Sequence, residues 1–513
     1  MNSFFRHSLI AGAVLASINA RADIKLPAII SDHMVVQAEA AVPIWGWGAP
    51  GEQVSLSLAG QTQSAKTGND GRWQASFNLL KANGQPQTLT VTGSNSLTVN
   101  DVLIGEVWLA SGQSNMAFTV QRAQNYEQEK AAAQHPLLRM FTVTAGAVPR
   151  PQSDCGGKWE VCTPESLEGF SAVAYFFGRE LQQTLKTPVG LVHSSVGGTD
   201  IAAWTSMEAQ QKVPELNAFL SRWKAQDEAY DAAKAQTEYK QKTIEWKAAT
   251  AQARAAGKTL PRKPPGPLQP RMNANYPAHL FESRLAPLIP YGIKGAIWYQ
   301  GEHNSATPAE GLRYRLQLPL LINDWRSRWG SDFPFAWVQL PGFATSGSGR
   351  AYVREAMLQN LSMKDTGMVV TLDVGEADNN HPRNKQAVGR RLALWALGDV
   401  YHLPGTITSG PLPAGQEIRD HEIVLSFTHT EQGLVAHGEL KGFVIAGEDQ
   451  KWQPATARIE GDKVIVGNAG VAHPKAVRYA WAASPECSLF NGAGLPASPF
   501  RTDEWTESAP VKP

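Results

Sequence analysis

The sequence is short of three things: an excess of charge, cysteine, and apolar runs long enough to cross a membrane. Its 47 lysine and arginine residues balance 46 aspartate and glutamate residues, which leaves a net charge of +1. This balance argues against a nucleic-acid partner and against an acidic interaction tail. No apolar run reaches the length of a transmembrane helix, so no membrane span is expected.

The three cysteines permit one disulfide at most. Cys155 and Cys162 are seven residues apart around a Gly-Gly turn, and they could close a small loop in an oxidising compartment. Spacing alone does not fix the geometry of a disulfide, so this pairing stays open. Cys487 has no remaining partner and is expected to be a buried thiol.

The N-terminus has the pattern of a secretory signal peptide. Arg6 precedes an apolar region at residues 8–19, and a small-x-small cleavage site ends at Ala22. We therefore expect residues 1–22 to be removed and the mature chain to begin at Asp23. Such a protein is exported and soluble, in a periplasm or outside the cell.

A chain of 513 residues is too long for one hydrophobic core, so several domains are expected. Residues 23–100 and 403–513 consist of short alternating apolar runs between turn residues, which predicts a sandwich-like β-domain at each end. Residues 101–402 instead alternate apolar strands with helical segments. This alternation predicts an α/β fold, with a parallel sheet covered by helices on both faces.

The central region contains five strand-like apolar runs. These strands are placed at residues 103–110, 188–194, 292–298, 334–340 and 367–373. The helices are placed near residues 168–186, 308–329, 349–363 and 384–398. Residues 206–267 interrupt the pattern with segments rich in Ala, Lys, Gln and Glu and with a proline-rich linker, which we interpret as a solvated helical insertion.

Chemically distinctive residues follow four of these strands. Ser114 follows the first strand, Gly197-Gly198 the second, residues 299–304 the third and His381 the last. Because the carboxyl ends of parallel strands meet at one edge of a sheet, we expect these residues to gather there. Each pattern alone is typical of an ordinary turn or loop, and only the ordered combination indicates a site.

The combination fits acyl transfer by an activated serine. A serine hydroxyl is a weak nucleophile until a base takes its proton, and His381 is the candidate base for Ser114. Asp378, three residues earlier, could accept a hydrogen bond from the other ring nitrogen and stabilise the imidazolium. The backbone N–H groups of Ser114 and Gly198 are the predicted donors to the oxyanion of the tetrahedral intermediate.

A third oxyanion donor is expected from a side-chain amide, either Gln300 or Asn304. Glu302 and His303 lie between these two, but without the ligand spacing of a metal site, so no metal is expected. The turn around the candidate serine has Met116 where the elbow of an α/β-hydrolase has its second glycine. This difference favours another serine-esterase architecture.

The chain resembles the sialate O-acetylesterase-like branch of the SGNH (GDSL-type) hydrolases. The matching stretches cover most of the mature chain: residues 105–116 (GEVWLASGQSNM), 170–181, 194–204, 292–304 (GIKGAIWYQGEHN), 373–397 and 489–505. The first and fourth are the most specific. The resemblance implies an SGNH-type α/β fold and a serine esterase that removes O-acetyl groups from sugars without metal or cofactor. It implies Ser114 as nucleophile and His381 as base.

Two details need a choice within that family pattern. Many relatives carry Asp two residues before the histidine, where this chain has Asn379. Asp-x-x-His is the commoner arrangement across SGNH hydrolases, so the resemblance assigns the acid to Asp378, with Asp373 and Glu376 as reserves. Gln300 is preferred as the amide donor because it stands in the Trp-Tyr-Gln-Gly-Glu motif.

The predicted function is an exported carbohydrate O-acetylesterase whose partner is an O-acetylated sugar. Acetylated sialic acid, xylan and xyloglucan are all possible substrates, because a fold does not decide between them. Two alternatives remain open: a carbohydrate-binding protein with an inactive hydrolase core, and a broader GDSL-type lipase or esterase. The sequence does not indicate an oligomeric state.

Overall fold

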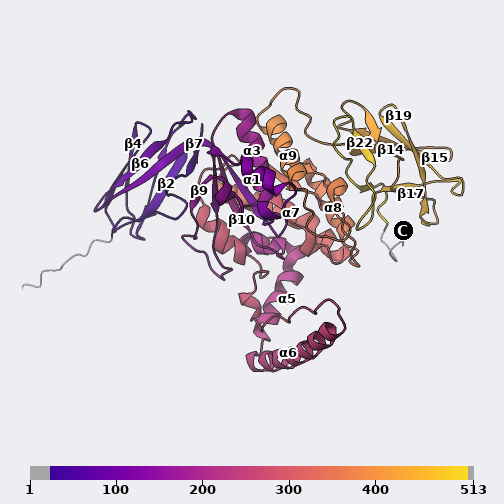
Figure 1. Ribbon diagram of the computed structural model, residues 1–513, viewed down its shortest axis with the longest axis horizontal. Coiled ribbons are helices and arrows are strands. Elements are labelled where there is room, and N and C mark those ends of the chain that lie inside the picture. The colour runs from indigo at the N-terminus through magenta and orange to yellow at the C-terminus, as the bar shows by residue number, and fades with distance from the viewer. Residues whose placement is uncertain (1–22, 506–513) are drawn as a thin grey trace, which may run out of the picture.

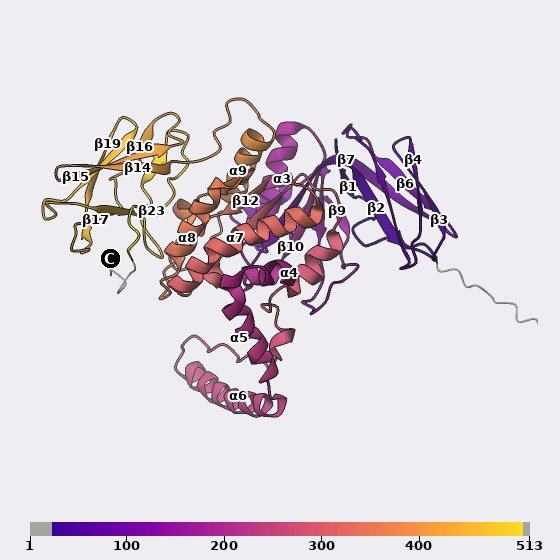
Figure 2. The same cartoon turned by 180° about the vertical axis from the view of Figure 1, so that it is seen from behind.

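The computed structural model describes residues 23–505 (Figure 1). The expected signal peptide, residues 1–22, lies outside the described residues. N-terminal strands, a central α/β region and C-terminal strands follow one another along the long axis of the molecule. Helices α5 (Asn217–Glu228) and α6 (Ala232–Ala255) project from the central region as a separate arm, as Figures 1 and 2 show.

The central sheet has six parallel strands in the order β13-β12-β11-β7-β10-β8, and β9 joins its edge antiparallel to β8. The strands are β7 Ser96–Gly112, β8 His135–Thr142, β9 Trp159–Cys162, β10 Val189–Ser195, β11 Gly295–Tyr299, β12 Phe335–Val338 and β13 Thr366–Val369. Every residue of β10, β11 and β12 is buried, as expected for strands covered on both faces. The five predicted strands are present, and β8 and β9 extend the sheet beyond the prediction.

Helices cover both faces of this sheet. α3 (Ala172–Leu185) and α9 (Lys385–Trp395) pack together on one face, and α7 (Pro308–Trp329) packs with α8 (Arg350–Gln359) on the other. Successive residues of β11 belong to the two different apolar clusters, because side chains alternate across a strand. Two shorter helices are α1 Tyr126–Ala132 and α2 Pro164–Leu167. The predicted α/β architecture is confirmed.

The N-terminal strands lead directly into the central sheet. They are β1 Val35–Gln37, β2 Val42–Trp47, β3 Gln53–Leu58, β4 Gln61–Lys66, β5 Arg72–Phe77 and β6 Gln87–Thr92. β3 alternates exposed and buried residues, so one face lies on a core. The first half of β7 pairs with β6, and its second half pairs with β10 and β11. The domain boundary expected at residue 100 therefore falls inside one continuous strand.

The C-terminal region is antiparallel. Its strands are β14 Leu412–Arg419, β15 Glu422–Thr428, β16 Leu434–Ala436, β17 Phe443–Ala446, β18 Gln453–Pro454, β19 Thr456–Glu460, β20 Lys463–Gly467, β21 Ala476–Tyr479, β22 Leu489–Asn491 and β23 Phe500–Arg501. The buried guanidinium of Arg354 on α8 donates to the carbonyl oxygens of Ala482 and Ala483 at 2.6 and 2.9 Å. Arg501 also pairs with Glu355 of α8 at 2.6 Å. These contacts fix the C-terminal strands on the central region.

The insertion expected at residues 206–267 is helical in its first part. α4 (Met207–Gln211) lies against the central region, α5 leads away from it, and no residue of α6 is buried. Residues 258–269 then return without helix or strand. None of the helices in residues 23–505 is both long enough and apolar enough to cross a membrane.

All three cysteines are free, so the disulfide left open between Cys155 and Cys162 is absent. Both thiols are buried, but they pack in different apolar clusters, and Cys162 is held in strand β9. Spacing along the sequence gave no information about this separation. Cys487 was expected to be buried and is instead partly exposed.

Candidate active site

The candidate nucleophile lies on a tight turn at the carboxyl end of β7. This strand ends at Gly112, where φ is +138° and a Cβ atom would lie 2.2 Å from the carbonyl oxygen of Tyr299. The N–H group of Gln113 donates to that same oxygen at 2.9 Å. Only glycine allows this close approach, because it has no Cβ. The turn then presents Ser114 at the edge of the sheet, partly exposed.

Ser114 and His381 form a hydrogen-bonded pair. His381 Nε2 lies 2.8 Å from Ser114 Oγ, although 267 residues separate the two in sequence. This distance is suited to proton transfer. Burial of the ring lowers the pKa of His381 below its usual 6.5, so the imidazole is largely neutral near pH 7. The predicted meeting of these two residues at the sheet edge is therefore observed.

Asn115 connects the serine turn to two other loops. Its Nδ2 donates to the carbonyl oxygen of Asn380 at 3.0 Å and to Glu302 Oε1 at 2.5 Å. Its Oδ1 accepts a hydrogen bond from Lys385 Nζ at 2.5 Å. The Asn115 side chain is fully buried, so these bonds replace those it would make to water. They hold the position of the adjacent Ser114 relative to the histidine loop.

Glu302 is the carboxylate whose charge acts on His381. Its negative charge raises the pKa of the ring, against the larger effect of burial, whereas the cations Lys385 and Arg122 lower it further. Glu302 Oε2 is buried and has no hydrogen-bond partner among residues 23–505. Sequence reasoning considered Glu302 only as a metal ligand, because nothing in its local pattern shows which histidine it approaches. The described residues contain no group of three or more His, Cys, Asp or Glu side chains arranged to hold a metal ion.

Lys385 is a buried cation beside the same pair. Its side chain is fully buried at the first position of α9, and Nζ lies 5.0 Å from the ring centroid of Phe118 and 5.2 Å from that of Tyr299. Burial lowers the pKa of Lys385 to about 7. Sequence reasoning missed this residue, since a lysine at the start of a helix usually faces solvent.

The structure does not bring Asp378 to His381. Asp378 is exposed, and no hydrogen bond among residues 23–505 reaches it from the ring. Asn379 instead accepts a hydrogen bond from the backbone N–H of His381 at 3.0 Å. The reserve carboxylates have other partners: Glu376 accepts from Asn379 Nδ2 at 2.8 Å, and Asp373 pairs with an arginine of α9 at 2.6 Å. The three-residue spacing correctly predicts that Asp378 lies in the same loop as His381, but it does not determine where the Asp378 side chain points.

Two backbone donors are available beside Ser114. Within the described part of the chain, the N–H groups of Ser114 and Gly198 donate no hydrogen bond. A Cβ atom on Gly197 would lie 3.3 Å from Ser114 Cβ, so the Gly-Gly turn runs against the serine. Gly198 has φ +71°, and a Cβ built there would meet nothing within 4 Å, which leaves that side of the turn open.

The amides of Gln300 and Asn304 have different surroundings. Gln300 Nε2 donates to the carbonyl oxygen of Thr199 at 2.8 Å and to Asn304 Oδ1 at 2.7 Å, so both of its N–H groups are used. Its Oε1 accepts from the Tyr314 hydroxyl at 3.0 Å. Asn304 Oδ1 also accepts from the N–H of Ile201, but Asn304 Nδ2 has no partner among residues 23–505. The free donor is thus on Asn304, and Gln300 orients it, in contrast to the expected preference.

Known proteins are similar to this chain over almost its whole length. Residues 104–244 and 274–397 match the family described as carbohydrate esterase, sialic acid-specific acetylesterase. The sialate O-acetylesterase of Homo sapiens is 30% identical over 96% of each chain, and that of Rattus norvegicus is 29% identical over 92% of this chain and 93% of its own. The crystal structure of a carbohydrate acetylesterase from Xanthomonas citri superposes with a TM-score of 0.79 at 34% identity, covering 94% of this chain and 100% of that one.

Proposed function

We propose that Ser114 is the nucleophile of this enzyme. The chain belongs to the carbohydrate esterase family of sialic acid-specific acetylesterases, and the proposal proceeds from that membership. The enzyme is a carboxylic-ester hydrolase that removes O-acetyl groups from carbohydrates. One observation carries the assignment of the nucleophile: the 2.8 Å separation between Ser114 Oγ and His381 Nε2 at the carboxyl edge of the sheet.

In the proposed reaction, Ser114 Oγ attacks the acetyl carbonyl carbon while His381 Nε2 takes the hydroxyl proton. The tetrahedral intermediate collapses, the bond to the sugar oxygen breaks, and His381 returns the proton to that oxygen. Water then attacks the acetyl-enzyme with His381 again as base, and acetate and free Ser114 are released. The imidazolium forms twice in each cycle, and the negative charge of Glu302 stabilises it both times.

The oxyanion receives hydrogen bonds from the backbone N–H groups of Ser114 and Gly198 and from Asn304 Nδ2. Support for this assignment is that all three donors lack an internal partner among residues 23–505. Donors that are already fixed in place cost little reorganisation when the charge develops. Asn304 is fixed by Gln300, and Gln300 is fixed in turn by Thr199 and Tyr314.

The substrate is an O-acetylated sugar, either free or in a glycan. Acetylated sialic acid agrees with the family description, and acetylated xylan and xyloglucan are also O-acetylated carbohydrates that the same ester chemistry would act on. The pattern in residues 1–22 supports export, so the substrate is met in a periplasm or outside the cell.

Acetate release from acetylated sialic acid, xylan and xyloglucan, measured side by side, tests this proposal. Ser114→Ala should reduce kcat by at least about 10³-fold on every substrate that the wild type uses. Ser195→Ala is the matched control, because Ser195 is another serine at the carboxyl edge of the sheet, at the end of β10, and its Oγ lies 2.5 Å from Nε2 of a histidine, His193. It should retain most of the activity. Full activity in Ser114→Ala with loss in Ser195→Ala would assign the nucleophile to the other pair.

A further inference from the structure

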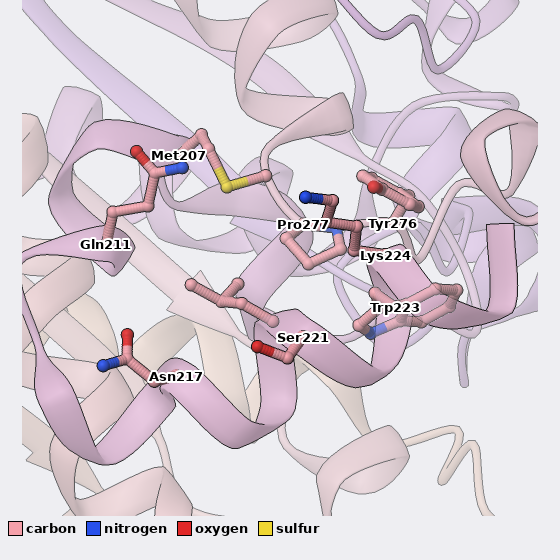
Figure 3. Close-up of a pocket in the computed structure, with 9 residues that line it drawn as sticks. Met207, Gln211, Asn217, Ser221, Trp223, Lys224, Tyr276 and Pro277 are labelled. Carbon is pink, nitrogen blue, oxygen red and sulfur yellow. The ribbon is translucent and has the colours of Figure 1, made fainter. Parts of the chain in front are cut away.

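A pocket of about 320 Å³ lies between the helical insertion and the segment that leads back to the sheet (Figure 3). Its walls come from α4, from α5 and from residues 276–277. The lining side chains are Met207, Gln211, Asn217, Leu220, Ser221, Trp223, Lys224, Tyr276 and Pro277. This volume is at the lower end of the range of about 300–1,000 Å³ that is typical of small-ligand sites. The proposed reaction uses none of these residues.

The pocket is joined to the loop that carries an oxyanion donor. Asn275, next to the pocket residue Tyr276, donates from Nδ2 to the carbonyl oxygen of Gly198 at 3.0 Å. Asn275 Oδ1 accepts a hydrogen bond from the N–H of Asp200 at 2.6 Å. One wall of the pocket therefore continues directly into the Gly-Gly turn beside Ser114. The hydrogen bonds of Asn275 thus connect the residue beside the pocket to the loop that flanks Ser114.

The aromatic wall of the pocket is held in place before any ligand binds. Trp223 and Tyr276 meet edge to face with ring centroids 5.5 Å apart, and Tyr276 stacks on His279 at 4.6 Å. Arg271 ties the returning segment to α5, because its N–H and Nε both bond to the carboxylate of Asp227, at 2.9 and 2.8 Å. Rings that are already ordered lose little conformational entropy when a ligand packs on them.

The chemistry of the lining matches an uncharged sugar. Aromatic rings offer apolar faces for sugar C–H groups, while the amides of Gln211 and Asn217 and the hydroxyl of Ser221 can exchange hydrogen bonds with sugar hydroxyls. The single cation, Lys224, lies 3.8 Å from the carboxylate of Glu228, and both are exposed. The lining contains no arginine, so the pocket lacks the guanidinium that typically binds a carboxylate in a bidentate manner.

We propose that this pocket, called here the Trp223 pocket, is a subsite for uncharged sugar units of the glycan that carries the acetyl ester. The inference rests on the proposed function, since it needs the ester at Ser114. It predicts that the enzyme distinguishes an acetylated oligosaccharide from a small acetyl ester through residues of the insertion, away from the reacting atoms.

The test compares kcat/KM on an O-acetylated xylo-oligosaccharide, on O-acetylated sialic acid and on 4-nitrophenyl acetate. Trp223→Ala should lower the ratio of oligosaccharide to 4-nitrophenyl acetate activity by about 3–10-fold, mainly through KM, as expected for the loss of one aromatic contact. Tyr239→Ala, on α6 and outside the pocket, is the control for aromatic loss in the insertion and should leave the ratio unchanged. The affinity of the Ser114→Ala protein for an unacetylated xylo-oligosaccharide should fall by a similar factor when Trp223→Ala is added.

The outcomes separate the two proposals. A wild type that is active on the esters but shows no change of ratio in Trp223→Ala overturns the subsite and leaves the nucleophile assignment standing. Ser114→Ala with wild-type activity overturns the reaction mechanism, whereas the oligosaccharide binding measurement still tests the pocket. A loss confined to O-acetylated sialic acid shows that the pocket recognises a charged sugar and contradicts the proposal. Thermal unfolding midpoints of the three single variants and of the double variant show whether each protein is folded.

Discussion

Two loops at the carboxyl edge of the sheet contribute to the site in opposite ways. The loop after β11, residues 300–304, is largely buried, with Gln300 0% and Asn304 1% exposed, and its amides form a connected chain of hydrogen bonds. The loop after β13, residues 372–381, lies at the surface and brings one side chain, His381, to the serine. The first loop has one carboxylate, Glu302, and the second has three, but among these only the charge of Glu302 acts on His381.

The difference follows from where each carboxylate meets solvent. Asp378 is exposed, so water and salt screen its charge. Glu302 is hydrogen-bonded to a fully buried asparagine and has one oxygen buried without a partner, in surroundings where charges interact more strongly. The buried loop therefore supplies the negative charge that acts on His381, and the exposed loop supplies His381 itself, the base. Substitutions in the two loops should differ in size and in their effect on the pH profile.

Asn304→Ala is expected to have the largest effect in this comparison. It removes the free amide donor of the buried loop, and loss of one oxyanion donor typically costs about 10²–10³-fold in kcat. Gln300→Met removes the support of that donor and should cost less, because the two backbone N–H groups remain. Steady-state kinetics on an acetylated sugar, with thermal unfolding as the check on folding, measures both. A larger loss in Gln300→Met would identify Gln300 as the donor.

Glu302→Gln should reduce kcat/KM by about 10–100-fold. This loss is smaller than the whole contribution of general acid–base catalysis, because His381 remains in place as the base. The negative charge of Glu302 raises the pKa of His381, so its removal lowers that pKa further. The base is active when neutral, and the acidic limb of the kcat/KM profile should therefore move to lower pH.

Lys385→Met is the counterpart of Glu302→Gln, because it removes a positive charge near His381 where Glu302→Gln removes a negative one. The charge of Lys385 lowers the pKa of His381, so the acidic limb should move to higher pH in that variant. Arg122 contributes in the same direction as Lys385 and is unchanged in both variants. Shifts in the same direction for Glu302→Gln and Lys385→Met would contradict the electrostatic role of this pair.

Periodicity and capping made much of this fold predictable. α7 spans residues 308–329, as predicted, because Thr307 and Glu310 cap its first turn reciprocally and Gly330 ends it in the left-handed conformation. The meeting of Ser114 and His381 was predictable for a topological reason, since both follow parallel strands of one sheet. These features depend on local sequence or on strand order alone.

The remaining features depend on contacts that a single sequence does not reveal. β8 was missed because its sequence, HPLLRMFT, contains Pro136 and Arg139. The buried arginine is paired with the carboxylate of Asp101, which comes from a distant segment, at 2.6 Å. The burial of Lys385 and its bond to Asn115 depend on how α9 docks against the serine turn. The orientation of the Asp378 side chain depends on the shape of its loop, which the hydrogen bonds of Asn379 with Glu376 and with the backbone of His381 determine.

Asp378→Asn should give the smallest effect and is the sharpest test of the comparison. Its carboxylate is exposed and has no hydrogen bond to His381 among residues 23–505, so kcat/KM should change by no more than about twofold, as for other screened surface charges. The acidic limb should stay in place, whereas it moves in Glu302→Gln. If Asp378→Asn instead lost as much activity as Glu302→Gln, the exposed loop would have to close on substrate binding and bring Asp378 to Nδ1 of His381. The division between an electrostatic buried loop and a base-carrying exposed loop would then hold only for the free enzyme.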